Sequence, residues 1–100
     1  MKIGILANSE KNMDDIIGIT RAATEKGHSV IIFAMDDGTK LFKDPSFAEL
    51  CLMDGVSTSF CDHSAEEKGS ETAGLPPEIV PGSQYNNATM VHESDRVIVL

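Results

Sequence analysis

The sequence predicts one α/β domain over residues 1–100, built on an open, mostly parallel sheet with helices on both faces. Two observations support this prediction. Short apolar runs rich in β-branched residues occur at 2–7, 30–34 and 96–100, and such runs are typical of strands covered on both faces. Segments with apolar residues at helical spacing separate them, and strand, helix, strand connections of this length are nearly always parallel. A chain of 100 residues has room for a single core of this kind.

The first helix is expected over 12–26. Asn12 stands where an N-cap is needed, with Asp15 three residues later as in a capping box, and apolar residues then recur at helical spacing. Gly27 follows the last turn, and glycine readily adopts the positive φ that ends many helices.

A second, short helix is expected to begin at Pro45 and to end before Gly55, after a turn at 36–38. The strand that follows, 56–60, alternates apolar and small polar residues. This alternation indicates that one of its faces is less enclosed than the faces of the first two strands.

A helical turn is expected over 62–68, ended by Gly69. Glycines and prolines interrupt the stretch 70–82, which is expected to be an irregular loop. Its apolar side chains suit docking on another subunit, so we expect a homo-oligomer. These side chains are Leu75, Ile79 and Val80. A last helix over 83–93 leads to the strand 96–100, which has the composition of a buried strand.

Composition argues against two classes of partner. The formal net charge is −8, and the eight Lys and Arg residues are scattered, which argues against nucleic-acid binding. No apolar run approaches the roughly 20 residues of a membrane helix, and polar residues follow the first strand where a signal peptide would be apolar. We expect no membrane association and a cytoplasmic location, where Cys51 and Cys61 would be free thiols.

Cys61 is the most informative residue, because it lies at the end of the third strand and the start of the next helix. Ligands of open α/β sheets bind at this edge. A helix terminus favours a thiolate by only about 0.3 to 1 kcal/mol, less than the ~1.4 kcal/mol of one pKa unit. Nearby carboxylates oppose the charge, so we expect His63, Lys68 or a cation of another subunit to complete the activation. The alternative is that Cys61 is a small buried hydrophobic residue.

The segment 55–69 contains a Gly-Val pair, a strand, Cys61, a stretch of small residues, and a basic residue followed by glycine. In this order it resembles the DsrE/TusD family of small sulfur-transfer proteins, and the segments 27–30, 37–38 and 94–100 add matches. The resemblance implies a flavodoxin-like, DsrE-like α/β fold and assembly into trimers or hexamers. It also implies a cysteine that receives sulfur as a persulfide and passes it to another carrier, and Cys61 matches that cysteine.

The leading hypothesis is a cytoplasmic sulfur carrier or sulfurtransferase component, in which Cys61 accepts sulfane sulfur and hands it to a partner thiol. His63 and Lys68 are the supporting residues, sulfur-donor and sulfur-acceptor proteins are the expected partners, and no cofactor is expected. The alternative is a non-catalytic oligomeric binding module of the same fold, with an inert Cys61. A phosphoacceptor receiver domain is disfavoured, because Asn8 and Ser9 stand where its acidic pair would follow the first strand.

Three further interpretations concern other residues. Cys51 lies among apolar residues on a predicted helix, and a core role is favoured over a second reactive thiol. A metal site of Cys61, His63 and His92 would lack a fourth ligand, and we expect no metal. Backbone N–H groups at 8–9 could hold a phosphate, but no glycine-rich phosphate motif accompanies them, so turn and capping roles are favoured.

Overall fold

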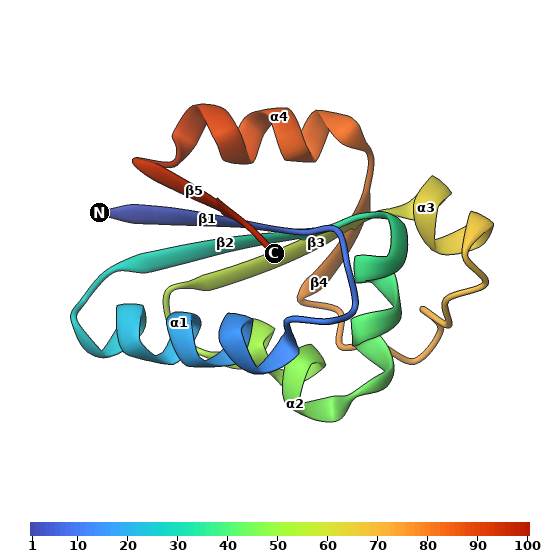
Figure 1. Cartoon of the computed structure of the whole chain (residues 1–100), viewed down its shortest axis with the longest axis horizontal. Helices are drawn as coiled ribbons and strands as arrows, with labels where there is room; N and C mark the ends of the chain where they lie inside the picture. The colour runs from blue at the N-terminus through green and yellow to red at the C-terminus, as the bar shows by residue number, and fades with distance from the viewer.

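A computed structural model describes all 100 residues as a five-stranded sheet between layers of helices (Figure 1). The strands are β1 (Lys2–Ala7), β2 (Ser29–Ala34), β3 (Val56–Cys61), β4 (Ile79–Gly82) and β5 (Arg96–Val99). The helices are α1 (Met13–Glu25), α2 (Pro45–Ala48), α3 (Asp62–Glu67) and α4 (Gln84–Glu93), with 3-10 segments η1 (Asp36–Lys43) and η2 (Glu49–Leu52). The strand order is β4-β3-β2-β1-β5. All four strand pairs are parallel, so the predicted α/β class is confirmed and the sheet is parallel throughout.

The two faces of the sheet are covered unequally. α1 and α2 lie on one face and α4 lies alone on the other (Figure 1). The larger hydrophobic cluster has 16 buried residues and includes side chains of α1 and α2. The smaller cluster consists of Phe33, Cys61 and Met90 on the α4 face. Cys61 therefore belongs to the thinner of the two layers. No helix has the length and apolar character needed to span a bilayer.

Most predicted elements are confirmed to within one residue at each end: β1, β2, β3 and β5, and α1, α3 and α4. The predicted helix from Pro45 does begin there, and the carboxylate of Asp44 accepts a hydrogen bond from the N–H of Ser46 at 2.8 Å. It changes to 3-10 geometry at Glu49 and ends at Leu52. The predicted turn at 36–38 opens into the longer 3-10 segment η1.

The prediction of an irregular loop over 70–82 is wrong at its end. Ile79–Gly82 form β4, an edge strand parallel to β3. Ile79 is 4% exposed and packs in the larger cluster, and Pro81 pairs with Phe60 in the register of the sheet. Proline lacks an N–H group and is tolerated on an edge strand. The residue that argued against a strand therefore marks the edge of the sheet.

The start of α1 differs from the predicted capping box. Asn12 occupies the N-cap position, but its side chain makes no capping hydrogen bond. Its Nδ2 donates to the carbonyl oxygen of Leu100 at 2.9 Å, and Ser9 Oγ donates to the same oxygen at 3.2 Å. These bonds tie the turn after β1 to the residue after β5, and a long-range contact of this kind has no signature in the local sequence.

β5 is more exposed than its composition predicted. It pairs only with β1, at the edge of the sheet, and the side chain of Val99 is 58% exposed. Its apolar composition resembles that of a central strand, but an edge strand has a neighbour on one side only.

Candidate functional site

Cys61 is the last residue of β3 and the N-cap of α3. It pairs with Gly82 of β4, so it lies at the edge of the sheet where the strands end and η1, α3 and the start of α4 meet (Figure 1). Ligands bind at this edge in open α/β sheets. The residue is only 6% exposed. The sulfur therefore lies at the carboxyl ends of the strands but is covered by neighbouring residues.

Apolar side chains surround one side of Cys61. Phe33 of β2 and Met90 of α4 are fully buried against it. Met35, which follows β2, packs against the same cluster with Leu6 and Ile31. Thioethers and aromatic rings are polarizable and pack well against sulfur. This side of the site excludes water from the thiol.

Hydrogen-bond donors of two helices, α3 and α4, act on the Cys61 thiol. Burial is the largest single influence on the Cys61 thiol and raises its pKa. The hydroxyl and N–H of Ser64, the side-chain amide of Gln84 and the N–H of His63 act in the opposite direction. Together these donors outweigh burial, and the pKa of Cys61 lies below its ordinary value. The thiol makes no capping hydrogen bond to α3, so we interpret these donors as groups that stabilise the thiolate after the proton has left.

Gln84 comes from the first position of α4. A capping box of Ser83 and Asn86 fixes this helix start, which follows directly on Gly82. The side-chain nitrogen of Gln84 also donates to the Sδ of Met35 at 3.7 Å. The amide that donates to the neighbouring thioether is therefore also one of the groups that lower the pKa of Cys61.

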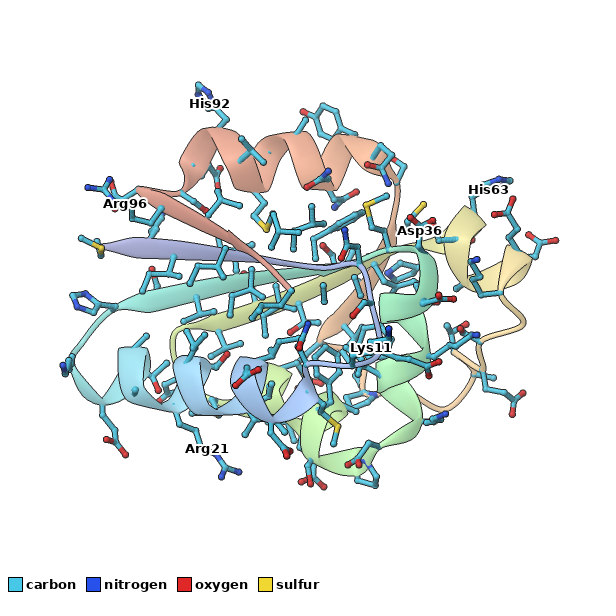
Figure 2. The ribbon with its side chains drawn as sticks, in the orientation of Figure 1. Lys11, Arg21, Asp36, His63, His92 and Arg96 are labelled. Carbon is cyan, nitrogen blue, oxygen red and sulfur yellow. The ribbon has the colours of Figure 1, made fainter.

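The two charged side chains predicted to support Cys61 contact carboxylates instead. His63 Nε2 lies 3.4 Å from Glu67 Oε2, and its side chain is 83% exposed on the outer side of α3 (Figure 2). Lys68 Nζ lies 3.6 Å from Asp37 Oδ1. Neither of these charges is among the groups that change the pKa of Cys61, to which His63 contributes only its backbone N–H. The site thus stabilises a thiolate with neutral donors.

α3 is attached to η1 by several polar contacts. Asp37 of η1 also pairs with Lys40, at 3.4 Å, so it bridges two lysines. Lys40 and then Lys68 hold the pKa of the Asp37 carboxyl below its ordinary value. Beyond α3, the Ser70 hydroxyl is hydrogen-bonded to the buried Thr39 hydroxyl at 2.8 Å. The segment that carries Ser64 is therefore held at its C-terminal end.

Cys51 lies in the larger cluster, on the opposite face of the sheet from Cys61. Burial and the negative charge of Glu78 raise the pKa of its thiol. Both cysteines are free. The two thiols therefore have opposite environments, and Cys51 has the surroundings of a core residue.

Neither of the other ligand interpretations gathers a site. No three His, Cys, Asp or Glu side chains come together in an arrangement that could hold a metal ion. His63 and His92 lie at opposite ends of the molecule (Figure 2). At the turn before α1, Ser9 Oγ accepts a hydrogen bond from the N–H of Lys11 at 3.2 Å and donates to Leu100. That serine has the turn role favoured from the sequence.

A groove of about 290 Å³ runs between α4 and the strands β3 and β4. Its walls include Ser59, Val80, Tyr85 and Met90, and Tyr85 is 78% exposed. Met90 also contacts the Cys61 cluster from its other side. The groove and the Cys61 cluster therefore share Met90, although Cys61 itself does not line the groove.

Sequence reasoning missed Ser64 and Gln84. Ser64 has a recognisable signal, because it stands in the first turn of the helix that follows Cys61. Gln84 has none without β4, since only the pairing of Gly82 with Cys61 brings the start of α4 to the sulfur.

No protein family model and no curated protein matches the chain. Among solved structures, the crystal structure of the ychN protein from E. coli is similar to it, with a TM-score of 0.72 and 19% sequence identity. The match covers 100% of this chain and 99% of that one. At this identity the likeness shows a shared fold.

Proposed function

We propose that this protein is a sulfur carrier of the DsrE-like type, in which Cys61 accepts sulfane sulfur as a persulfide and passes it to a partner thiol. The observation that carries the proposal is the set of four donors around Cys61, which lower the pKa of a thiol that burial alone would raise. The thiolate is the nucleophilic form of cysteine. The resemblance of 55–69 to sulfur-transfer proteins and the fold shared with the ychN protein support the proposal.

The transfer consists of two thiol exchanges. The Cys61 thiolate attacks the outer sulfur of a donor persulfide, R–S–SH. A bond forms between Sγ and that sulfur, the donor S–S bond breaks, and the donor leaves as R–S⁻ with the bonding electron pair. An acceptor thiolate then attacks the outer sulfur on Cys61 in the same way and regenerates the Cys61 thiolate. Each exchange moves one sulfur atom without net oxidation or reduction.

The partners in this proposal are a donor protein, an acceptor protein and further copies of this chain. Val80 and Tyr85 leave apolar surface beside the groove on the α4 face, which suits protein docking. Because Cys61 is covered, docking has to be accompanied by a local movement that admits the donor sulfur.

The second candidate function is a non-catalytic binding module of the same fold. The 6% exposure of Cys61 and its packing against Phe33 and Met90 favour it, because a buried free cysteine is often only a small hydrophobic residue.

Persulfide uptake separates the two candidates. The protein is incubated with a low-molecular-weight persulfide, and its intact mass is measured under non-reducing conditions. The proposal expects a gain of one sulfur atom that disappears in Cys61→Ser and persists in Cys51→Ser, the matched control on the other face of the sheet. No uptake, or uptake that Cys61→Ser leaves unchanged, contradicts the sulfur-carrier proposal.

A further inference from the structure

The Gln84 amide is hydrogen-bonded to a second amide one turn further along α4. Asn87 Nδ2 donates to Gln84 Oε1 at 3.2 Å, while Gln84 Nε2 donates to Met35 Sδ at 3.7 Å. The geometry points to Asn87 as a positioning residue. It holds the Gln84 amide so that the NH2 group of Gln84, rather than its oxygen, faces the sulfurs of Met35 and Cys61. This inference deepens the proposed function and rests on it where it treats the thiolate of Cys61 as the reacting group.

The backbone places Gln84 at the sulfur whichever way its amide is turned. Cys61 pairs with Gly82 in the sheet, and α4 begins two residues later. Asn86 Oδ1 accepts the N–H of Ser83 at 3.0 Å, and a Cβ on Gly82 would overlap the Asn86 side chain. The close packing at Gly82 therefore fixes where Gln84 starts.

The two ends of the Gln84 amide have opposite effects on a thiolate. The NH2 group is a donor and stabilises a negative sulfur, whereas the carbonyl oxygen is an acceptor and repels it. A side-chain amide can rotate to exchange these ends, and its neighbours decide which orientation is favoured. Asn87 Nδ2 can donate only to an acceptor, so this contact selects the orientation in which Oε1 faces Asn87.

The other end of the Asn87 side chain supports a role for its nitrogen. Asn87 Oδ1 is buried and has no hydrogen-bond partner. A buried acceptor without a partner is unfavourable. The side chain's hydrogen bond is the one that its nitrogen donates to Gln84. An apolar residue would avoid the unsatisfied oxygen but would leave the Gln84 amide free to turn.

Charged groups near the site do not replace this effect. Asp36 of η1 and Asp62 and His63 of α3 are exposed, and α4 has no charged side chain in its first two turns. None of these charges is among the groups that change the pKa of Cys61, whereas the Gln84 amide is.

The test is a double-mutant cycle in the Cys51→Ser background, with the ultraviolet absorbance of the Cys61 thiolate measured against pH. Asn87→Asp keeps the shape of the side chain but offers only an acceptor, so the Gln84 amide should turn its NH2 group toward residue 87. Gln84 is a weaker donor to Cys61 than the Ser64 hydroxyl, so we expect the ratio of thiolate to thiol to fall by up to about tenfold. Asn87→Ala, which suits a helix and adds no charge, should lower it by a smaller factor.

The direct effect of the new carboxylate is measured by adding Asn87→Asp to Gln84→Ala. If Asn87 acts through Gln84, Asn87→Asp lowers the thiolate-to-thiol ratio of Cys61 clearly less in the Gln84→Ala background than when Gln84 is present. Equal changes in both backgrounds, or no change in Asn87→Asp and Asn87→Ala, overturn the inference. The absorbance requires no persulfide, so failure of this cycle is distinguishable from failure of the sulfur-uptake experiment.

Discussion

Ser64→Ala tests the proposed origin of the Cys61 thiolate most directly. The Ser64 hydroxyl is the strongest of the four donors that lower the pKa of Cys61, and Ser64 is buried. A hydrogen bond to a charged group contributes about 1.5 to 3 kcal/mol, and each 1.4 kcal/mol is about a factor of ten. Three other donors remain, so we expect the lower end of this range: about a tenfold loss of thiolate at pH 7.

The assay is the rate of alkylation by iodoacetamide as a function of pH, in the Cys51→Ser background. The inflection of the rate should move to higher pH in Ser64→Ala. Thr58→Val is the matched control, because Thr58 is a buried hydroxyl residue on β3. Side chains alternate along a strand, so Thr58 shares the face of Phe60, which belongs to the larger cluster, and not that of Cys61. The control variant should leave the inflection in place. Identical inflections in Ser64→Ala and the parent protein, or an equal displacement in Thr58→Val, would refute the assignment of donors.

The remaining predictions concern the stability of five variants, measured by urea unfolding. Thr58→Val should stabilise the protein by about 1 kcal/mol, because the Thr58 hydroxyl is buried without a partner; destabilisation would show that the hydroxyl has a partner. Gly38→Ala should destabilise by about 3 kcal/mol, since its Cβ would overlap the main-chain carbonyl that ends β1. Gly18→Ala, at an exposed position of α1 with open space for the added Cβ, should stabilise by about 0.5 to 1 kcal/mol. The reverse order of these two variants would contradict the packing of η1. Cys61→Ser should lose stability relative to the parent as pH rises toward 9. A lowered folded-state pKa adds stability that is present above the unfolded value and lost as pH falls through the folded value. Cys51→Ser should gain relative stability over the same rise, because a raised pKa adds stability below the unfolded value that is lost at higher pH; parallel pH profiles for the two variants would be inconsistent with opposite environments.

The fold was largely predictable because most of its helices and strands have signals in the residues that form them or lie next to them. The apolar runs of β1 and β2 and the helix stop at Gly27, which has a φ of 83°, are properties of neighbouring residues. β4 was not predictable in this way. Its four residues include Pro81 and Gly82, and they form a strand only because β3 is there to pair with. The role of Asn12 was missed for the same reason, since its partner Leu100 lies 88 residues away.

The candidate site was predictable in position but not in chemistry. Cys61 was located correctly at the junction of β3 and α3 from the residues around it. The sequence suggested that a cation had to balance the local carboxylates, but His63 and Lys68 have carboxylate partners of their own. Neutral donors replace the cation, and whether a serine or glutamine faces a sulfur depends on packing that a pattern of residue types does not contain.

For the proposed sulfur transfer, the attachment of α3 to η1 bears on how a donor reaches Cys61. The cover over Cys61 has two halves: α3 brings the Ser64 donors, and the start of α4 brings Gln84. α3 has only six residues. A helix this short depends on tertiary contacts, such as the ion pair of Asp37 with Lys68, to stay ordered. An outward movement of α3 would make room for the sulfur donor, but it would also remove the Ser64 hydroxyl, the strongest stabiliser of the thiolate. In the proposed transfer, access to Cys61 and a low pKa of its thiol are therefore opposed. Of the donors, only the Gln84 amide on α4 would stay beside the sulfur both with α3 in place and with α3 displaced.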